Sequence, residues 1–433
     1  AGMVPGEKKG FFRRMWRTFT LFFSSATDLA TTMLSLFGLW KKRSKAAEQV
    51  PMKRRARRVL VDLGPTFVKG GQILSTRPDL IPDDWCEEFS SLQDNVAPET
   101  LETVEKEIAS SLGQATSDLM YSFDPEPLAS ASIAQVHRAR AYDGREVVVK
   151  VRRPGVKTSI VRDLQILRFL SRSVESQFPE ARLVDTQGIL DEIDKSVRAE
   201  TDFRVEAGHI ERMRQNFEGF EGVSIPEVIQ DCTTEAVLTM EFLDGVPIRD
   251  ARAAGYDMEK VGKSYLEAAF KMLFADGFFH GDLHPGNVLV LKDGTLGLLD
   301  FGMVGRLSEE MTDQIVAVVM ALQRRDFRTI ARIFYEIGIK EVPVNYRVFE
   351  QDVMEIMDSI FVGRAMADIQ IGAFMRELAS GCIRHRIRMA PSFTMLLKAL
   401  ITTEGLAKTL IPEINPLEVM GPYIEKLAAR RFS

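Results

Sequence analysis

Three polar residues near the middle of the chain have the types and the spacing needed to move a phosphoryl group. Asp282 lies in the sequence His280 to Asn287, with Asn287 five positions after it, and Asp300 opens an Asp-Phe-Gly triplet further on. A transferred phosphoryl group carries dense negative charge, so its site needs metal ions on the oxygens and a carboxylate beside the attacking hydroxyl or water. Asp282 is predicted to be that catalytic carboxylate. Asn287 and Asp300 offer oxygen ligands that suit Mg²⁺, and both are predicted to bind it.

Short apolar runs flank these residues: Phe278-Phe279 before them, then Val288 to Val290 and Leu296 to Leu299. They are predicted to be short buried strands, which places the polar residues on a loop between packed elements. The order and spacing are those of the catalytic loop and metal-binding triplet of protein kinases. Each motif alone occurs often by chance, so the prediction of a kinase-like site rests on finding both in the same order.

A predicted hairpin supplies a cation for the same site. Residues Ser132 to His137 and Val147 to Val151 form β-branched runs around a tight Asp-Gly turn. Lys150 follows three valines, an apolar strand pattern similar to that of the kinase lysine that binds the α and β phosphates. A buried strand lysine needs an acidic partner, and Glu206, in a helical segment from about Ile189 to Phe217, is predicted to supply it. A lysine that merely reaches solvent from the end of the strand is the alternative.

The loop expected to cover the phosphates has alanines where a kinase has glycines. Alanine does not easily adopt a positive φ and keeps the backbone further from the phosphates, so the nucleotide geometry should differ from that of an ordinary kinase. A hinge between two lobes is predicted after the strand Ala236 to Thr239, where its backbone would meet the adenine edge. The predicted nucleotide-binding residues, besides Lys150, are Leu128, Ala129, Ser130, Ala131, Ser132, Ile133, Ala134, Gln135, Val136, Met240, Glu241 and Leu243.

Two further departures concern the protein substrate of an ordinary kinase. Gly281 stands where the kinase signature has an arginine, so control through a phosphorylated activation loop loses its usual anchor. After Asp300-Phe301-Gly302 a helical pattern begins at about Ser308, and no Ala-Pro-Glu sequence lies nearby. The platform that holds peptides is therefore missing, and phosphorylation of another protein is disfavoured.

The whole chain of 433 residues has the composition of a soluble globular protein, with 45% hydrophobic and 27% charged residues. Its three cysteines, Cys86, Cys232 and Cys382, are far apart and form no metal or disulfide pattern, which indicates a reducing compartment. The length fits a two-lobed kinase core with helical additions. We expect no nucleic-acid partner.

The net charge of −5 hides a strongly basic N-terminal segment. Residues 1–60 carry fourteen lysines and arginines against three acids, and these basic clusters bracket an apolar stretch from Phe19 to Trp40. Basic plus apolar residues favour an anionic membrane surface. Asp28 lies in the middle of the stretch, so an interfacial or protein-packed helix is preferred to one that spans the membrane. A helix that is simply docked on the protein is the alternative.

At this point the chain resembles the UbiB (AarF) family of atypical protein-kinase-like proteins over roughly residues 55–310. Four motifs carry the resemblance: Lys69-Gly70-Gly71-Gln72, which continues from Ser75 to Pro82; the alanine-rich loop Ala129 to Ala134; Glu200-Thr201-Asp202 followed by Glu206-Ala207; and the loop His280 to Asn287. The first and the third are highly specific to this family.

The resemblance implies an N-terminal helical extension that lays the Lys69 to Gln72 motif over the site, where a peptide would otherwise bind. Lys69, Gln72, Glu200 and Asp202 are then regulatory residues that line the pocket and limit kinase activity. A lysine near phosphates and carboxylates near that lysine or the metal make electrostatic sense. A salt-bridge network that only staples the extension to the core is the alternative.

The resemblance also implies a role in the biosynthesis of ubiquinone or a related isoprenoid quinone, through binding and hydrolysis of ATP with Mg²⁺. The expected partners are an isoprenoid lipid or quinone precursor, a membrane surface and quinone-biosynthesis enzymes, at the cytoplasmic face of a bacterial inner membrane. Family members with hydrophobic C-terminal helices lead us to expect that the full gene continues past Ser433 for roughly forty residues with apolar spans.

The expected fold is α+β, a two-lobed protein-kinase-like fold with an N-terminal helical extension and an enlarged helical C-terminal lobe. The predicted divisions are a basic, apolar membrane-associating segment (1–55), the helical extension (56–121), the N-lobe (122–243) and the C-lobe (244–433). Two other functions stay open. One is a nucleotide-binding pseudokinase scaffold, and the other is a phosphotransferase of the aminoglycoside or choline type, which shares the His-Gly-Asp loop and lacks the Lys69 to Gln72 motif.

Overall fold

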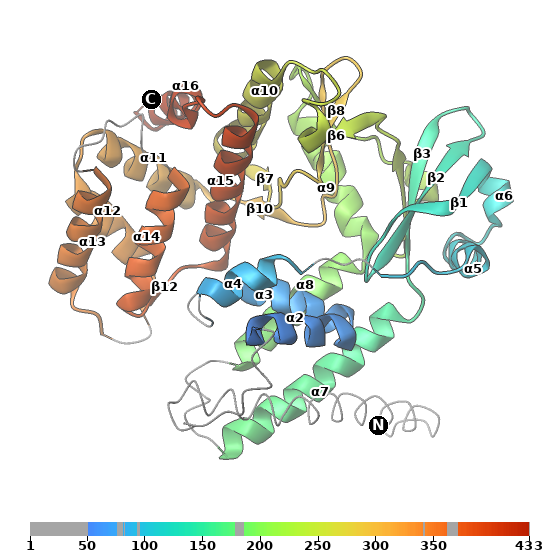
Figure 1. Cartoon of the computed structure of the whole chain (residues 1–433), viewed down its shortest axis with the longest axis horizontal. Coiled ribbons are helices and arrows are strands. Elements are labelled where there is room, and N and C mark those ends of the chain that lie inside the picture. The colour runs from blue at the N-terminus through green and yellow to red at the C-terminus, as the bar shows by residue number, and fades with distance from the viewer. Residues whose placement is uncertain are drawn as a thin grey trace.

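The computed structural model describes residues 51–75, 81, 83–92, 96–177, 186–340, 343–361 and 371–432. Figure 1 shows a smaller lobe built on an antiparallel sheet, a larger and mostly helical lobe, and the extension helices alongside them. The predicted two-lobed α+β fold is confirmed. The basic, apolar segment predicted to bind a membrane lies outside the described residues up to residue 50, as do residues 76–80 and 82 of the Ser75 to Pro82 motif.

The smaller lobe is a four-stranded antiparallel sheet in the order β1-β2-β3-β5. Its strands are β1 (Met120–Ser130), β2 (Ala134–Ala141), β3 (Glu146–Arg152) and β5 (Val237–Glu241). Alternate valines of β3 pack against α5 (Leu101–Leu112), where Val104 and Ile108 are buried. Lys150 has the opposite parity, so it points to the other face of the sheet.

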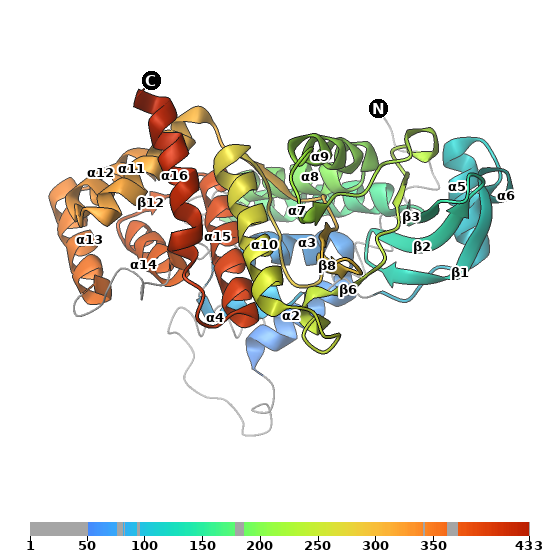
Figure 2. The same cartoon turned by 90° about the horizontal axis from the view of Figure 1, so that it is seen from above.

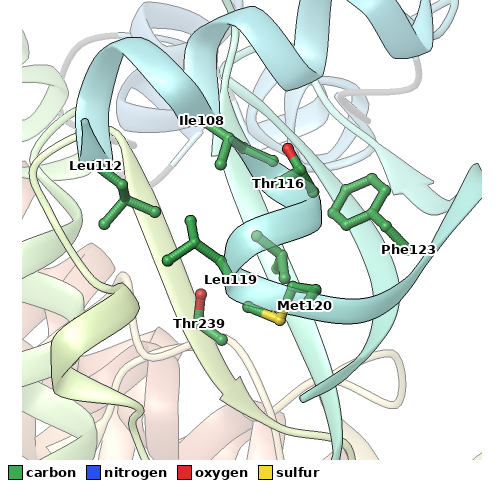
Figure 3. A pocket seen from close by; sticks show the side chains of 8 residues that line it. Ile108, Leu112, Thr116, Leu119, Met120, Phe123 and Thr239 are labelled. Atoms are coloured by element: carbon green, nitrogen blue, oxygen red, sulfur yellow. The ribbon is translucent and has the colours of Figure 1, made fainter. Parts of the chain in front are cut away.

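A small apolar cavity remains between α5 and the sheet (Figure 3). Ile108 and Leu112 of α5, Thr116 and Leu119 of α6 (Thr116–Leu119) line it together with side chains of the strands. Its volume of about 10 Å³ is close to the minimum that one water needs. The cavity is a packing gap and is too small for a ligand.

Three helices follow the hairpin and carry the predicted partner of Lys150. They are α7 (Val156–Gln177), α8 (Thr186–Glu200) and α9 (Phe203–Asn216). The prediction of one continuous helix from Ile189 to Phe217 is wrong, because the helix is interrupted at Thr201 and Asp202. The Asp202 carboxylate accepts a hydrogen bond from the Arg204 amide at 3.2 Å and caps the first turn of α9.

The extension consists of α2 (Met52–Leu63), α3 (Pro65–Ser75) and α4 (Asp83–Ser90). The helical periodicity of the sequence from Val59 to Leu74 predicts a helix over this range, but Gly64 adopts a φ of +103° and Pro65 begins a new helix. The two glycines of the Lys69 to Gln72 motif permit close packing. A Cβ at Gly71 would lie 2.4 Å from Leu92, and one at Gly70 would touch Ile193 of α8 at 3.4 Å.

Much of the basic surface of α2 faces acidic residues of α4. Arg57 Nε lies 3.0 Å from Glu88 Oε1, and Lys53 Nζ lies 3.3 Å from Asp84 Oδ2. Arg54 also approaches Glu88, at 3.8 Å. Part of the positive charge of the N-terminal region is therefore neutralised within the extension itself.

Short strands hold the catalytic loop in the larger lobe. They are β4 (Val223–Ser224), β6 (Gly245–Pro247), β7 (Phe278–His280), β8 (Val288–Leu291), β9 (Leu296–Leu298), β10 (Val304–Arg306), β11 (Ile339–Lys340) and β12 (Ile387–Arg388). The sheet order is β4-β9-β8-β6, while β7 pairs with β10 and β11 with β12. The three strands predicted around the catalytic loop are confirmed as β7, β8 and β9. The loop is thus anchored by pairing on both sides, before Asp282 and after Asn287.

The rest of the larger lobe is helical and shares one continuous hydrophobic core with the catalytic strands. Its helices are α10 (Met258–Phe270), which continues into the π-helical turn η5 (Lys271–Ala275), α11 (Glu309–Gln323), α12 (Phe327–Ile337), α13 (Tyr346–Phe361), α14 (Ile371–Arg384), α15 (Pro391–Leu410) and α16 (Pro416–Phe432). Short 3₁₀ turns are η3 (Gln230–Cys232) and η4 (Ile248–Asp250). α15 packs along α10, as both views show (Figures 1 and 2). Within the described ranges, no helix has both the length and the hydrophobicity required to cross a membrane.

Candidate functional site

A buried histidine fixes the backbone of the catalytic loop. The His280 ring is fully buried, with Nε2 2.9 Å from the Leu299 carbonyl oxygen and Nδ1 accepting a hydrogen bond from the Asp282 amide at 3.1 Å. Burial lowers the pKa of His280, although the bond to Leu299 opposes the shift, so the ring is neutral and Nδ1 is free to accept. The imidazole therefore sets the position of Asp282 through the main chain.

Asn287 closes the loop from the other end. Its side-chain nitrogen donates to the Asp282 carbonyl oxygen at 3.0 Å, and its amide donates to the His284 carbonyl oxygen at 2.9 Å. With the side-chain nitrogen used in this way, the carbonyl oxygen of Asn287 is left to face a ligand. The Asp282 carboxylate itself is one-third exposed, with 32% of its side chain accessible.

Asp300 supplies a second oxygen ligand. Its backbone has a left-handed φ of +56°, and its Oδ1 accepts a hydrogen bond from the Gly302 amide at 3.2 Å. The Lys150 ammonium, 3.9 Å away, is the main cause that lowers the pKa of Asp300, so the carboxylate is charged. Mg²⁺ bound through substrate phosphates needs only one or two protein oxygens, and Asn287 with Asp300 fits that requirement. Across the described residues no group of three or more His, Cys, Asp or Glu side chains forms a metal site by itself.

Lys150 and Glu206 meet across the two halves of the smaller lobe. Lys150 Nζ donates to Glu206 Oε2 at 2.8 Å and to Oε1 at 3.0 Å, and only 18% and 6% of their side chains are exposed. Burial by itself would lower the pKa of Lys150, and the nearby Glu206 and Asp300 carboxylates raise it well above its ordinary value. Burial pushes the pKa of Glu206 upward, and the adjacent ammonium opposes this. We assign the pair as ionised, because two carboxylates surround one ammonium.

The alanine-rich loop is held by an arginine whose role no sequence motif indicates. Arg153, only 8% exposed, donates from Nε to the Ala131 carbonyl oxygen at 2.7 Å and from one terminal nitrogen to Ser130 Oγ at 2.7 Å. The same guanidinium bonds to Glu99 at 2.8 Å and to the Ala97 carbonyl at 2.7 Å. The predicted residues from Leu128 to Val136 are therefore the end of β1, the turn from Ala131 to Ile133 and the start of β2, and Arg153 ties this turn to the segment that precedes α5.

The hinge residues are in place between the lobes, but two of their amides are already used. The Glu241 amide donates to the Glu227 carbonyl at 2.8 Å, and the Phe242 amide donates to the Glu146 carbonyl at 3.0 Å. Met240 and Leu243 are buried, at 7% exposure each. A surface hollow of about 200 Å³ lies beside this hinge and is lined by Glu241 and Phe242, with none of the predicted catalytic residues in its wall.

The four residues predicted to be regulatory lie in three separate places. Lys69 of α3 meets Glu200 at the end of α8, with 2.7 Å between Nζ and Oε2. Lys69 is among the charges that lower the pKa of Asp300, after the larger effect of Lys150, so the pair lies within electrostatic range of the predicted metal ligands. Gln72 instead donates to the Leu92 carbonyl oxygen at 3.2 Å, inside the extension. Asp202 pairs with Arg204, whose hydrogen bond lowers the pKa of Asp202.

One basic residue at the catalytic loop was not predicted. Lys398 of α15 places Nζ 2.9 Å from Asp282 Oδ1. Lysines on apolar helices give no signal of this kind in the sequence, because nothing local indicates which loop the helix will contact.

Comparison with known families separates the chain into two parts. A family model described as ABC1 atypical kinase-like domain matches residues 91–334, and one described as UbiB helical domain matches residues 353–415. The chain belongs to the UbiB family of ABC1 atypical kinase-like proteins. The resemblance predicted from the four motifs is thereby confirmed.

Curated UbiB relatives are similar over most of their length. A "Probable protein kinase UbiB" of Marinobacter nauticus is 35% identical over 385 residues, which cover 87% of this chain and 70% of that protein. One with the same name from Azotobacter vinelandii is 34% identical over 91% of this chain and 74% of that protein. Both are bacterial proteins named as kinases.

One solved structure of low sequence identity supports the fold of this chain, and only the fold. The structure described as the complex of Rv3197 with erythromycin from Mycobacterium tuberculosis superposes with a TM-score of 0.52 at 23% identity, over 84% of this chain and 97% of that one.

The matched UbiB helical region, residues 353–415, includes all of α15 and therefore Lys398. The kinase-like and helical regions of this UbiB protein thus meet at Asp282.

Proposed function

We propose that this UbiB-family protein binds ATP with Mg²⁺ and transfers the γ-phosphoryl group to water or to a small isoprenoid-lipid or quinone-precursor acceptor. The observation that carries the proposal is the position of Lys150, held 2.8 Å from Glu206 and 3.9 Å from Asp300. An ordered ammonium beside a metal-binding carboxylate is what the phosphates of a nucleotide require. A lysine that simply reached solvent would not be buried between two carboxylates.

Each residue has a distinct task in this reaction. Lys150 binds the α and β phosphates, Glu206 keeps its ammonium in position, and the Ala129 to Ala134 turn covers the phosphates. Asn287 and Asp300 would hold Mg²⁺, which when bound would neutralise charge on the phosphates. The hinge from Met240 to Leu243 contacts the adenine. Because the Glu241 amide already donates to the Glu227 carbonyl oxygen, the hinge binds the adenine through its other backbone groups.

Asp282 accepts the proton of the attacking hydroxyl. As the new bond from that oxygen to the γ phosphorus forms, the bond between the γ phosphorus and the bridging oxygen to the β phosphate breaks and ADP leaves with the electron pair. When water attacks, the products are ADP and inorganic phosphate, and Asp282 returns the proton to solvent. Its position is favourable because His280 and Asn287 both fix the Asp282 main chain.

A small acceptor is favoured over a protein substrate. The extension approaches the site through the Lys69 and Glu200 pair, and the chain passes from Gly302 through β10 directly to α11 at Glu309, with little length for a peptide platform. The relatives' name associates them with UbiB, which supports a role in ubiquinone or related quinone biosynthesis. We place this role at a membrane surface, contacted by the basic N-terminal segment.

Complementation of a strain that lacks the gene tests this proposal. We expect the deletion to lower the cellular isoprenoid-quinone content, the wild-type gene to restore it, and the Asp282→Asn gene at equal protein level to leave it low. Quinones in lipid extracts are measured by mass spectrometry. Asp143→Asn is the matched control, because Asp143 is half-exposed in the turn between β2 and β3, pairs with Arg145 and has no task in the proposed reaction.

The outcomes separate the alternatives. Unchanged quinone content in the deletion strain would show that the protein is not needed for isoprenoid-quinone biosynthesis. Full restoration by Asp282→Asn would favour the nucleotide-binding scaffold, in which the protein organises partners without transferring phosphate.

A further inference from the structure

The residue before the catalytic aspartate is enclosed by a helix from the other part of the chain. A Cβ on Gly281 would lie 3.0 Å from Met303 Cγ and 3.2 Å from Met395 Sδ. Met395 belongs to α15, so this helix rests directly on the loop at the position where ordinary kinases have an arginine. Any side chain on Gly281 would therefore require the Met303 or Met395 side chain to shift.

The same helix brings its own cation to the loop. Lys398 follows Met395 by three positions, so both lie on one face of α15. Lys398 Nζ is 2.9 Å from Asp282 Oδ1, and 34% and 32% of the two side chains are exposed. An ion pair this accessible contributes little to folding stability, which indicates that its effect is on the charge and orientation of the carboxylate.

The second oxygen of Asp282 faces a weaker partner. His284 Nε2 lies 3.8 Å from Asp282 Oδ2, and His284 Nδ1 accepts a hydrogen bond from the Gly286 amide at 2.9 Å. The proton of the neutral ring is therefore on Nε2, toward Asp282. Among the ion pairs of the described residues, Asp282 has Lys398 as its lysine partner and His284 as its other partner.

Contacts near both of its ends hold α15 in position. Leu396 and Ala407 are buried, and the Arg252 guanidinium donates to the carbonyl oxygen of Leu410 at 2.9 Å. On α10, which packs along α15, the buried Tyr265 hydroxyl donates to the Leu283 carbonyl oxygen at 3.0 Å. α10 thus contacts both α15 and the catalytic loop, so the Lys398 ammonium has a fixed position relative to Asp282.

We propose that Lys398 is a positioning residue for phosphoryl transfer, and that the helical region is an obligatory part of the catalytic site because it supplies this ammonium to Asp282. The inference rests on the proposed function. A carboxylate that accepts a proton next to a γ phosphate faces electrostatic repulsion from it, and an adjacent ammonium offsets that repulsion while it fixes one carboxylate oxygen. Lys398 thus supplies, from outside the catalytic loop, an ammonium 2.9 Å from Asp282 Oδ1.

Steady-state phosphate release from ATP with Mg²⁺, by the full chain, tests this role. We expect Lys398→Met to lower kcat by about 10- to 100-fold while KM for ATP changes less than about threefold, because the lysine acts on the transition state more than on nucleotide binding. Lys398→Arg keeps the charge and should restore kcat to within roughly fivefold of the wild type.

Lys408→Met is the matched control. Lys408 lies on the same helix, is 32% exposed and pairs with Glu404 at 2.9 Å, away from the loop. We expect its kcat to stay within about twofold of the wild type even if its melting temperature falls, which separates a loss of helix stability from a loss of chemistry.

Four results would overturn the inference. Turnover by the wild type with an unchanged kcat in Lys398→Met would show that the lysine does not position Asp282, and a higher kcat would show that it restrains the site. Equal losses in Lys398→Met and Lys408→Met would assign the effect to folding. If the wild type forms neither ADP nor free phosphate from ATP, with or without anionic liposomes, the proposed function fails and this inference fails with it.

Discussion

Lys69 Nζ lies 2.7 Å from Glu200 Oε2, and this ion pair joins α3 of the extension to the last residue of α8. Their side chains are only 12% and 30% exposed. The break after Glu200 is the point at which α9 turns toward Lys150 with Glu206. The pair therefore links the position of the extension to the element that holds the phosphate-binding lysine.

Loss of this pair should open the site. We expect Glu200→Gln to speed the release of a fluorescent ADP analogue by about 5- to 20-fold, because a mostly buried charge pair is replaced by a weaker hydrogen bond. Stopped-flow displacement measures the rate. Glu102→Gln, in the exposed pair with Lys106 on α5, is the control and should leave it unchanged. An unaltered rate in Glu200→Gln would mean that the pair only staples the extension to the core.

The rigidity of the alanine-rich turn depends on Arg153. Its fork of donors bonds to the Ala131 carbonyl, Ser130, Glu99 and the Ala97 carbonyl, and lysine cannot reproduce that geometry. We expect Arg153→Lys to weaken ATP binding by about 5- to 10-fold in calorimetric titrations. Arg140→Lys, which alters an exposed pair with Glu146 on the same sheet, is the control. Equal affinities in wild type and Arg153→Lys would refute this role.

Glycine in the turn should act through backbone freedom. We expect Ala131→Gly to relax the loop and to change the ATP affinity or the rate of autophosphorylation by roughly threefold or more, since glycine reaches conformations that alanine does not. Radiolabel incorporation and calorimetry measure the two quantities. If both stay at wild-type values, the alanine in place of glycine has no effect on nucleotide geometry.

The buried His280 predicts a pH dependence of stability. The pKa of His280 is lowered in the folded state, so the unfolded chain binds the proton at a higher pH than the folded chain does. The contribution of the neutral ring to the free energy of unfolding is therefore complete above about pH 6.5, the ordinary pKa of histidine, and declines as the pH falls toward the folded pKa. We expect His280→Asn to be about 1–3 kcal/mol less stable at pH 8 in urea unfolding, and to lose less stability between pH 8 and pH 5. His137, whose pKa is lowered by burial, is present in both proteins and cancels. Parallel pH profiles would contradict the assignment of a neutral His280.

The absence of a side chain at Gly281 is itself testable. Restoration of the kinase arginine, Gly281→Arg, should force α15 away from the loop, lower the free energy of unfolding by about 1–3 kcal/mol and reduce phosphate release. Gly405→Arg is the control on the same helix, because a Cβ there meets no atom within 4 Å and arginine favours a helix more than glycine does. A Gly281→Arg protein with wild-type stability and turnover would show that α15 does not require this space.

The sequence was most informative where a short motif determines both chemistry and geometry. The loop from His280 to Asn287, the strand with Lys150 and the pairing partner Glu206 could be identified because residue type, spacing and strand pattern agree. The breaks at Gly64 and Asp202 were missed, since helical periodicity continues across them and only the capping geometry ends the helix.

Residues that act through distant contacts could not be found in this way. Arg153 follows a strand and looks like a solvent-facing charge, and its contacts with Ala131 and Glu99 arise only when β1 and the segment before α5 fold around it. Lys398 lies on a largely apolar helix whose packing partner is set by tertiary structure. Local patterns carry no information about either contact.

Phosphate release by the wild type and by Asp282→Asn is the most direct measurement of the central claim, that this loop transfers a phosphoryl group. With ATP and Mg²⁺ we expect a measurable kcat for the wild type and a loss of about 10²- to 10⁴-fold for Asp282→Asn, with ADP affinity within roughly threefold. Equal phosphate release by the two proteins would contradict the account.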